Sequence, residues 1–199
     1  GGGGGGCRQV FSDDNQAGSG SCNFVPFGTV SGTALANQKY QTIVRAGTLG
    51  GQPGDITGLA FAPCGGGLRE HARIRIRMSH VPNGHQLQAA FAQNVPNPVT
   101  VLESRDWRWP NERSTWSRIG LMAPFAYDGS SDVVIEIEVE GSNFNSSPEE
   151  FRAANRERVS AFGWTGSPPA TGTVLSGGAL KMRLEFACAS VNRQGTPCS

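Results

Sequence analysis

Two tryptophans and the arginines beside them form the part of this sequence with the strongest binding chemistry. They lie in the stretch RDWRWPNERSTW. Tryptophan and arginine are enriched at the centres of protein interfaces, and an aromatic ring also offers a stacking surface to a ligand. Because Pro110 adjoins them, Trp107 and Trp109 are expected at the surface. The predicted binding residues, for a protein or a glycan, are therefore Trp107, Trp109, Arg105 and Arg108.

No recognised catalytic motif occurs in the sequence. The only histidines are His71, His80 and His85, and the motifs G-x-S-x-G and H-E-x-x-H and a phosphate-binding glycine loop are all missing. A hydrolase with dispersed acids ranks last, because its Asp or Glu side chains would have to converge in a concave pocket with raised pKa values. We predict that the protein is not an enzyme and uses no cofactor.

Metal binding is only weakly indicated. His80 and His85 flank a VPNG turn and could meet as two ligands, but a third ligand is not evident. Asp128 and Asp132 are weak candidates for calcium, which takes oxygen ligands from loops. Turn chemistry explains Asp128 better, since Asp bonds its own backbone and the following Gly129 accepts a positive φ. The prediction is therefore no metal site.

Three glutamates alternate with apolar residues in DVVIEIEVE. Glycoside hydrolysis would need two carboxylates about 5 to 9.5 Å apart in a cleft. Glutamates on one strand face are better explained as a solvated stripe that pairs with arginines of HARIRIRMSH across neighbouring strands. The residues concerned are Glu136, Glu138 and Glu140, with Arg73, Arg75 and Arg77. This arrangement favours a structural role for the whole set.

Five cysteines favour disulfides and a compartment outside the cytoplasm. They lack the C-x-x-C pairs of zinc and redox sites. We expect Cys7 to pair with Cys22 and Cys188 with Cys198, which leaves Cys64 free, although other pairings stay open. Cys7 also resembles, weakly, the cysteine that is lipid-modified in bacterial lipoproteins.

Composition and charge exclude several classes of protein. The chain has 199 residues and a formal net charge of +1, so no overall field favours nucleic acid or an anionic membrane. No apolar stretch approaches the roughly 20 residues that cross a bilayer. Glycine reaches 28 copies and proline 12, a balance that favours short strands joined by turns. We expect neither a nucleic acid partner nor a membrane span.

Strand-length segments separated by turns predict an all-β fold, an antiparallel, jelly-roll-like β-sandwich. Three segments alternate between a buried and a wet face. Their predicted buried residues are Ala72, Ile74, Ile76 and Met78; Val133, Ile135, Ile137 and Val139; and Leu180, Met182, Leu184 and Phe186.

One or two short helices are expected in the connections, at HQLQAAFAQN and at SPEEFRAANRER. The second has Ser147 as its N-cap and Pro148 at the first helical position. Residues 1–23 are predicted to be an N-terminal arm, whose six opening glycines are interpreted as a tag or a placeholder. The sandwich is predicted over 24–190 and a C-terminal tail over 191–199.

The stretch from Trp116 onward resembles a known sequence motif. It is similar to the W-x-x-I-x-L-x-x-P-F-x-Y-D-G-x-x-x-L-x-x-E pattern of a secreted bacterial β-sandwich domain, found in extracellular proteins of planctomycetes and related phyla. The matching residues are Trp116, Ile119, Leu121, Pro124, Phe125, Tyr127, Asp128 and Gly129. The resemblance covers roughly residues 22–190 and implies an exported jelly-roll sandwich. It implies little about activity, because its residues are structural.

A well-specified scaffold without a catalytic motif favours an accessory role. We expect a non-enzymatic, extracytoplasmic subunit, periplasmic or at the cell surface, that docks on a larger protein assembly through its loops, its tails and the Trp107/Trp109 segment. Compatible assemblies are a cell-surface layer, a polymer-degrading complex, and a periplasmic cap on a membrane-bound electron-transfer or photosynthetic complex. The alternative is a carbohydrate-binding module of a secreted bacterial protein, with the two tryptophans as a stacking platform for a glycan.

Overall fold

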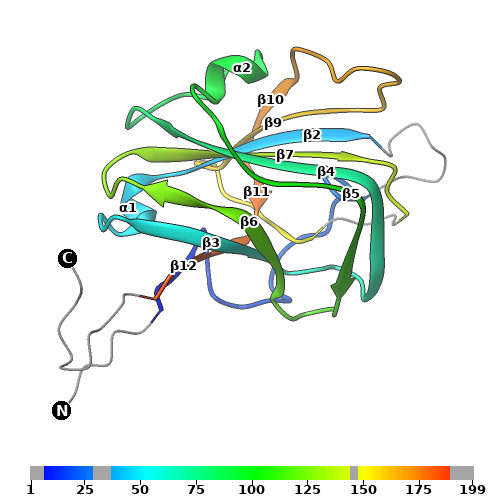
Figure 1. The fold of residues 1–199 in the computed structure, drawn as a ribbon, viewed down its shortest axis with the longest axis horizontal. Helices are drawn as coiled ribbons and strands as arrows, with labels where there is room; N and C mark the ends of the chain where they lie inside the picture. The colour runs from blue at the N-terminus through cyan, green and yellow to red at the C-terminus, as the bar shows by residue number, and fades with distance from the viewer. Residues whose placement is uncertain (1–6, 29–36, 144–147, 189–199) are drawn as a thin grey trace.

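Two antiparallel sheets pack face to face in the structure, a computed structural model that describes residues 7–28, 37–143 and 148–188 (Figure 1). The four-stranded sheet has the order β1 (Gln9–Phe11), β12 (Met182–Phe186), β3 (Gly54–Phe61) and β6 (Ser117–Tyr127). The six-stranded sheet has the order β10 (Thr173–Ser176), β9 (Glu157–Phe162), β2 (Gln38–Val44), β7 (Asp132–Glu140), β4 (Gly67–Val81) and β5 (Val99–Asn111). A two-stranded sheet pairs β11 (Ala179–Leu180) with β8 (Glu150–Phe151). The predicted all-β sandwich is confirmed.

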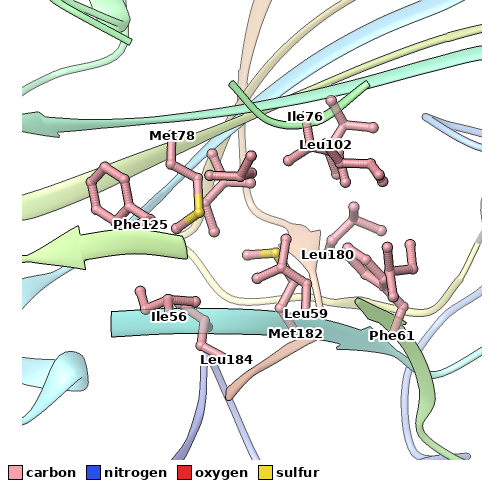
Figure 2. Close-up of a cluster of buried hydrophobic side chains, with 14 of the residues drawn as sticks. Ile56, Leu59, Phe61, Ile76, Met78, Leu102, Phe125, Leu180, Met182 and Leu184 are labelled. Atoms are coloured by element: carbon pink, nitrogen blue, oxygen red, sulfur yellow. The ribbon is translucent and has the colours of Figure 1, made fainter. Parts of the chain in front are cut away.

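The main hydrophobic core lies between the two large sheets. Figure 2 shows side chains of β3 and β12 pointing toward those of β4 and β5. The residues labelled there are Ile56, Leu59, Phe61, Ile76, Met78, Leu102, Phe125, Leu180, Met182 and Leu184. The predicted alternation is therefore confirmed for most positions, but Ala72 is exposed rather than buried. The cause is a change of face within β4, which also builds the candidate site described below.

A smaller apolar cluster covers part of the other face of the six-stranded sheet. Helix α2 (Phe91–Asn94) lies in the predicted HQLQAAFAQN segment. Its Phe91 packs with Leu87 and Val95 against Val134 and Val159, whose side chains point away from the main core. The second helix, α1 (Ala46–Leu49), follows β2.

The helix predicted in SPEEFRAANRER does not form over its described residues, while Ser147 lies outside them. The backbone of Glu149 bonds to other segments instead: its N–H donates to the Ala62 carbonyl, and its own carbonyl accepts the N–H of Lys181. β8 covers Glu150–Phe151 and β9 begins at Glu157, with a turn between the two strands. Pairing with distant strands thus overrides the local capping signals.

The N-terminal arm packs along the sandwich and is held by buried charges. The ammonium group of Lys181 is buried and donates to Asp14 Oδ1 at 2.7 Å, to the Gln16 carbonyl at 2.7 Å and to Ser19 Oγ at 2.5 Å. The Lys181 hydrogen bond and charge lower the pKa of Asp14 against an opposing effect of burial. The backbone N–H of Gly20, also on the arm, donates to Glu149 Oε2 at 2.9 Å.

Two disulfides fix both ends of the arm, with a pairing different from the predicted one. Cys7 bonds to Cys188 and Cys22 to Cys64, so the expected Cys7–Cys22 and Cys188–Cys198 bonds are wrong and Cys64 is not free. Cys198 lies outside the described residues. Strand pairing explains the pattern, because β1 runs beside β12 and brings Cys7 to Cys188. Bridges from Ser21 to Glu150 and from Pro63 to Pro148 likewise bring Cys22 to Cys64.

Candidate functional site

A change of face in two paired strands creates a hollow at one end of the six-stranded sheet. β4 and β5 pair Arg73 with Arg105 and His71 with Trp107, and the pairing skips Ala72 and Asp106 between them. Asp106 has φ +49, a left-handed conformation that few non-glycine residues adopt. Between this point and the paired ends Gly67 and Asn111, the side chains that face inward are at odd-numbered positions. In the adjoining part of the two strands they are at even-numbered positions. The bend turns Ala72 outward and His71 inward.

The hollow, called here the His71 hollow, has a volume of about 280 Å³. Its lining residues are Glu70, His71, Ala72, Asp106, Arg108, Gly141 and Asn143. Small residues keep it open: Gly141 has φ +66, and a Cβ there would lie 2.9 Å from the Cβ of Ala72. An ion pair between Arg108 Nε and Glu70 Oε1, at 3.1 Å, borders it. The strand bend thus leaves a small, open hollow among charged side chains.

His71 is a buried histidine with unusual surroundings. It is 2% exposed, and neither ring nitrogen has a hydrogen-bond partner among the described residues. Its ring stacks on Trp107 with centroids 5.6 Å apart and meets Phe27 at 6.0 Å. Burial, and then the positive charge of Arg69, lower the pKa of His71 to about 4. The imidazole is therefore neutral at physiological pH and offers one donor and one acceptor.

Of the four predicted binding residues, one tryptophan is buried, the other is half-buried, and both arginines are exposed. Trp109 is 2% exposed, so the expectation that it lies at the surface is wrong; it packs on Phe27 and Phe61 in the core. Trp107 is half-buried between Trp109 and His71. The two rings therefore form no exposed stacking platform. Arg105 and Arg108 are both exposed, and of these two only Arg108 lines the hollow.

Trp116, by contrast, lies away from this site. It precedes β6 and is half-buried, with its ring 5.3 Å from that of Phe11 on the N-terminal arm.

The alternating glutamates pair with arginines as predicted, but they are not solvated. The register sets Arg73 opposite Glu140, Arg75 opposite Glu138 and Arg77 opposite Glu136. The Glu138 carboxylate lies 3.0 Å from both Arg73 Nη1 and Arg75 Nη2, and Lys39 Nζ approaches it to 3.5 Å. Glu136 and Glu138 are only 1% and 2% exposed.

The physical reason for this burial is the position of β7 between β2 and β4. Cationic side chains of both neighbours lie over its carboxylates, with Lys39 on one side and the arginines on the other. Gln41 on β2 also donates to Glu136 Oε2 at 2.7 Å. These side chains form a structural network, which we call the charged ladder.

The weak metal candidates are satisfied by protein groups. Asp128 Oδ1 accepts the N–H groups of Ser130 and Ser131, as the predicted turn requires. Asp132 accepts from Arg45 Nη1 at 2.9 Å and from the backbone of Ala46 and Gly84. These bonds lower the pKa of Asp132 although burial opposes them.

His80 and His85 turn to different partners. His80 Nε2 accepts the N–H of Asp128 at 3.2 Å, and His85 Nε2 lies 3.1 Å from Asn94 Oδ1. The described residues contain no group of three or more side chains that could hold a metal ion.

Sequence reasoning missed His71 because it assumed one alternation along HARIRIRMSH. A signal for the change of face is nevertheless present in β5. Leu102 is buried at an even position, whereas Trp107 and Trp109 are large hydrophobic residues at odd positions of the same strand. A parity change of this kind indicates that the strand does not keep a single alternation; the pairing of β4 with β5 nevertheless keeps its register across Ala72 and Asp106.

A second surface feature is the open edge of the six-stranded sheet, called here the β9–β10 edge. β10 is the last strand on its side and all of its residues are exposed. Val174 is 42% and Leu175 40% exposed, and Phe162 on β9 is 48% exposed. Six large hydrophobic side chains are exposed among the described residues, and half of them lie here. An exposed edge strand that carries apolar side chains is suited to pairing with another strand.

None of the described helices is long and apolar enough to span a membrane. No family model, curated protein or solved structure matches the chain.

Proposed function

We propose that the protein is a non-enzymatic accessory subunit that works outside the cytoplasm and docks on a larger protein assembly. The observation that carries the proposal is the apolar β9–β10 edge. An exposed edge strand presents unpaired backbone N–H and C=O groups and is a template for a strand of another chain. The docking partner is therefore an extended segment of another protein subunit that adds to β10.

The side chains of the edge suit such a partner on both faces of the sheet. Val174 pairs with Val159 and Leu175 with Arg158, so the two exposed apolar side chains of β10 point to opposite faces. Every second residue of an antiparallel edge strand also directs its N–H and C=O away from its neighbour. A partner strand with apolar residues at successive positions would satisfy these groups and bury Val174 and Leu175 together.

The disulfides support a location outside the cytoplasm. Bonds between cysteines 181 and 42 residues apart persist in oxidising compartments and are rare in reducing ones. Together with the Lys181 contacts they also hold the arm rigidly on the sandwich. A preorganised body loses little conformational entropy when it docks, and this favours stable assembly.

Photo-crosslinking in the source organism tests the proposal. A photoreactive phenylalanine analogue replaces Leu175 in one variant and Met122 in a matched control, because Met122 is 73% exposed but lies on β6 of the other sheet. We expect a covalent adduct with one fixed protein subunit from position 175 and none from position 122. Equal labelling at both positions, or none at either, would contradict docking at this edge.

Hydrogen exchange separates strand addition from other contacts. Outward N–H groups of β10 should exchange quickly in the isolated protein and slowly in the purified assembly. Replacing Leu175 with lysine should weaken assembly, and replacing Met122 with lysine should leave it unchanged. A protein that stays monomeric in extracts of its source at every concentration would refute the subunit role.

A further inference from the structure

Of the edge strands in the two large sheets, β10 lacks the features that usually hinder pairing with another chain. β5 carries exposed charges and Pro110, β6 carries Arg118 and Pro124, and β1 has only three residues. Charged side chains, prolines and short length protect natural sheet edges from pairing. β10 reads TVLS and contains neither a charge nor a proline. The fold therefore protects its other described edges and leaves the β9–β10 edge open to a partner.

Residues 89–91 of the same chain already lie beside the segment that leads into β10. The N–H of Gly172 donates to the Ala89 carbonyl at 2.9 Å, within an antiparallel bridge. Because the backbone groups of a strand alternate in direction, Val174 and Ser176 turn their N–H and C=O groups to the same side as Gly172. Among the described strands, none lies next to β10 on this side. A partner strand at these positions would continue the line of residues 89–91.

The chain leaves the edge directly after β10. Gly177 has φ +89, and its N–H donates at 2.9 Å to the carbonyl of Arg156, the residue that precedes β9. The open edge is thus limited to Thr173–Ser176, on the order of 13 Å at about 3.3 Å per residue. A stretch of this length suits a short linear segment of a partner and not the edge of a second large sheet.

One face of the β9–β10 edge has an open hollow, called here the Phe162 hollow. Thr173 pairs with Ser160, so their side chains point to the same face as Phe162 and Leu175. The hollow has a volume of about 420 Å³, and none of its lining residues is charged. Phe162 is 48% exposed, and its ring meets that of Phe24 edge to face at 5.5 Å. An aromatic side chain of the partner suits this surface, because rings pack favourably edge to face or offset.

Charge distinguishes the other end of the edge. Arg152 is exposed and forms no ion pair with the residues that the structure describes, whereas Arg158 has Glu150 at 3.8 Å. A Cβ at Gly178, two residues beyond β10, would lie 3.8 Å from Cγ of Arg152. A positive charge without a counterion therefore stands where β10 ends, and an acidic side chain of the partner would complement it.

Building on the proposed docking function, we infer that the partner segment runs antiparallel to β10 and has a defined order of side chains. From its N-terminus it carries an acidic residue, any residue, two apolar residues and an aromatic residue. The acidic side chain then meets Arg152, the apolar pair lies opposite Leu175 and Val174, and the aromatic ring, opposite Thr173, covers the Phe162 hollow. Antiparallel pairing agrees with β9 and β10 and is more stable per residue than parallel pairing.

Fluorescence anisotropy with the full chain tests this order. The probe is an acetylated and amidated pentapeptide, Asp-Thr-Leu-Val-Phe, with a fluorophore on a flexible linker. Its control is the reversed peptide, which has the same composition. We expect saturable binding of the first peptide and binding at least about tenfold weaker for the second, since the reversed peptide cannot match both ends of an antiparallel pairing. Equal binding of the two peptides, or no saturable binding of the first at millimolar concentration, would overturn the inference.

Matched variants at exposed positions locate the peptide. Phe162→Ala should weaken binding by about tenfold through the lost aromatic contact, and Met122→Ala on the other sheet should have no effect. Ser176→Pro removes an outward N–H that β9 does not use and should weaken binding by about threefold or more. Arg152→Gln should weaken it by about twofold to fivefold, whereas Arg105→Gln, on the opposite edge strand, should leave it unchanged. Equal effects of Phe162→Ala and Met122→Ala would contradict binding at the hollow.

Photo-crosslinking from position 175 separates the order of side chains from the docking function itself. The crosslinked fragment of the partner subunit is identified by mass spectrometry. A fragment that contains the acidic, apolar and aromatic residues in this order would support the inference. An adduct with a fragment that lacks them would overturn the inferred order and leave docking at the edge intact. The absence of any adduct would instead contradict the docking function.

Discussion

Replacing His71 with phenylalanine should remove a large part of the acid sensitivity of the fold. The pKa of His71 is lowered to about 4 by burial and by Arg69, against an ordinary value of 6.5. Between these values the unfolded chain binds a proton that the folded chain does not, so stability falls as the pH falls. The stabilising effect of neutral His71 is complete above pH 6.5 and is lost on the way down to pH 4. The difference corresponds to about 3 kcal/mol, at roughly 1.4 kcal/mol per pH unit.

The substitution separates the effect of His71 on stability from that of its charged neighbours. Arg69, whose charge lowers the pKa of His71, stays in place, and so do Glu70, Asp106 and Arg108 of the neighbouring hollow. The phenylalanine ring can keep the stacking contacts of the imidazole. At pH 7 the variant should be at least as stable as the wild type to within about 1 kcal/mol, because it buries no unpaired polar atom.

Urea unfolding at pH 7 and pH 4.5, followed by tryptophan fluorescence, provides the measurement. Carboxylates with lowered pKa values, such as Asp132 and Glu185, also contribute stability that is lost in acid, but this loss is the same in both proteins. The wild type should therefore lose about 2 kcal/mol more than His71→Phe between the two pH values. An equal loss in both proteins would refute the assignment of a neutral, buried His71.

Three further predictions concern stability. Glu138→Gln leaves two arginines and Lys39 around a neutral amide and should lower the free energy of unfolding in urea by several kcal/mol. Glu103→Gln, at a side chain that is 52% exposed, should lower it by less than about 1 kcal/mol. Equal losses would contradict the role of burial at Glu138. Replacing Cys22 and Cys64 together with serine opens a 42-residue separation and should lower the free energy of unfolding by about 4 kcal/mol, with an unchanged melting temperature as the contrary result. Lys181→Met should expose the arm to limited proteolysis between residues 13 and 20 while the sandwich stays resistant, and an arm that remains protected would show that Lys181 does not hold it.

The alternation of apolar and polar residues was enough to predict the strands that keep the same face toward the core along their length. Met182, Leu184 and Phe186 face the core, and Arg183 and Glu185 face outward, as the pattern indicates. The pairing of arginines with glutamates also followed from the sequence, because both alternate with the same period. Their burial did not, since it depends on β7 lying at the centre of the sheet, which local patterns do not encode.

The remaining errors share a cause in contacts between distant segments. The cysteine pairing depends on β1 lying beside β12, and the failed helix depends on the bonds of Glu149 to Ala62 and Lys181. Trp109 was placed at the surface because Pro110 and the charged residues around it resemble a loop. The left-handed conformation of Asp106, where β5 changes face, was not predicted, because Asp tolerates this conformation without requiring it. The candidate hollow was therefore visible only once both strands were paired.

The Cys7–Cys188 bond has a mechanical consequence for the molecule. It joins two positions 181 residues apart in the sequence. When the chain is pulled through the segments outside these cysteines, tension passes across one covalent bond and does not reach the residues between them. The sandwich would then transmit force without unfolding. After reduction of this bond, the same pull would act first on β1 and β12, the short terminal pair of the four-stranded sheet.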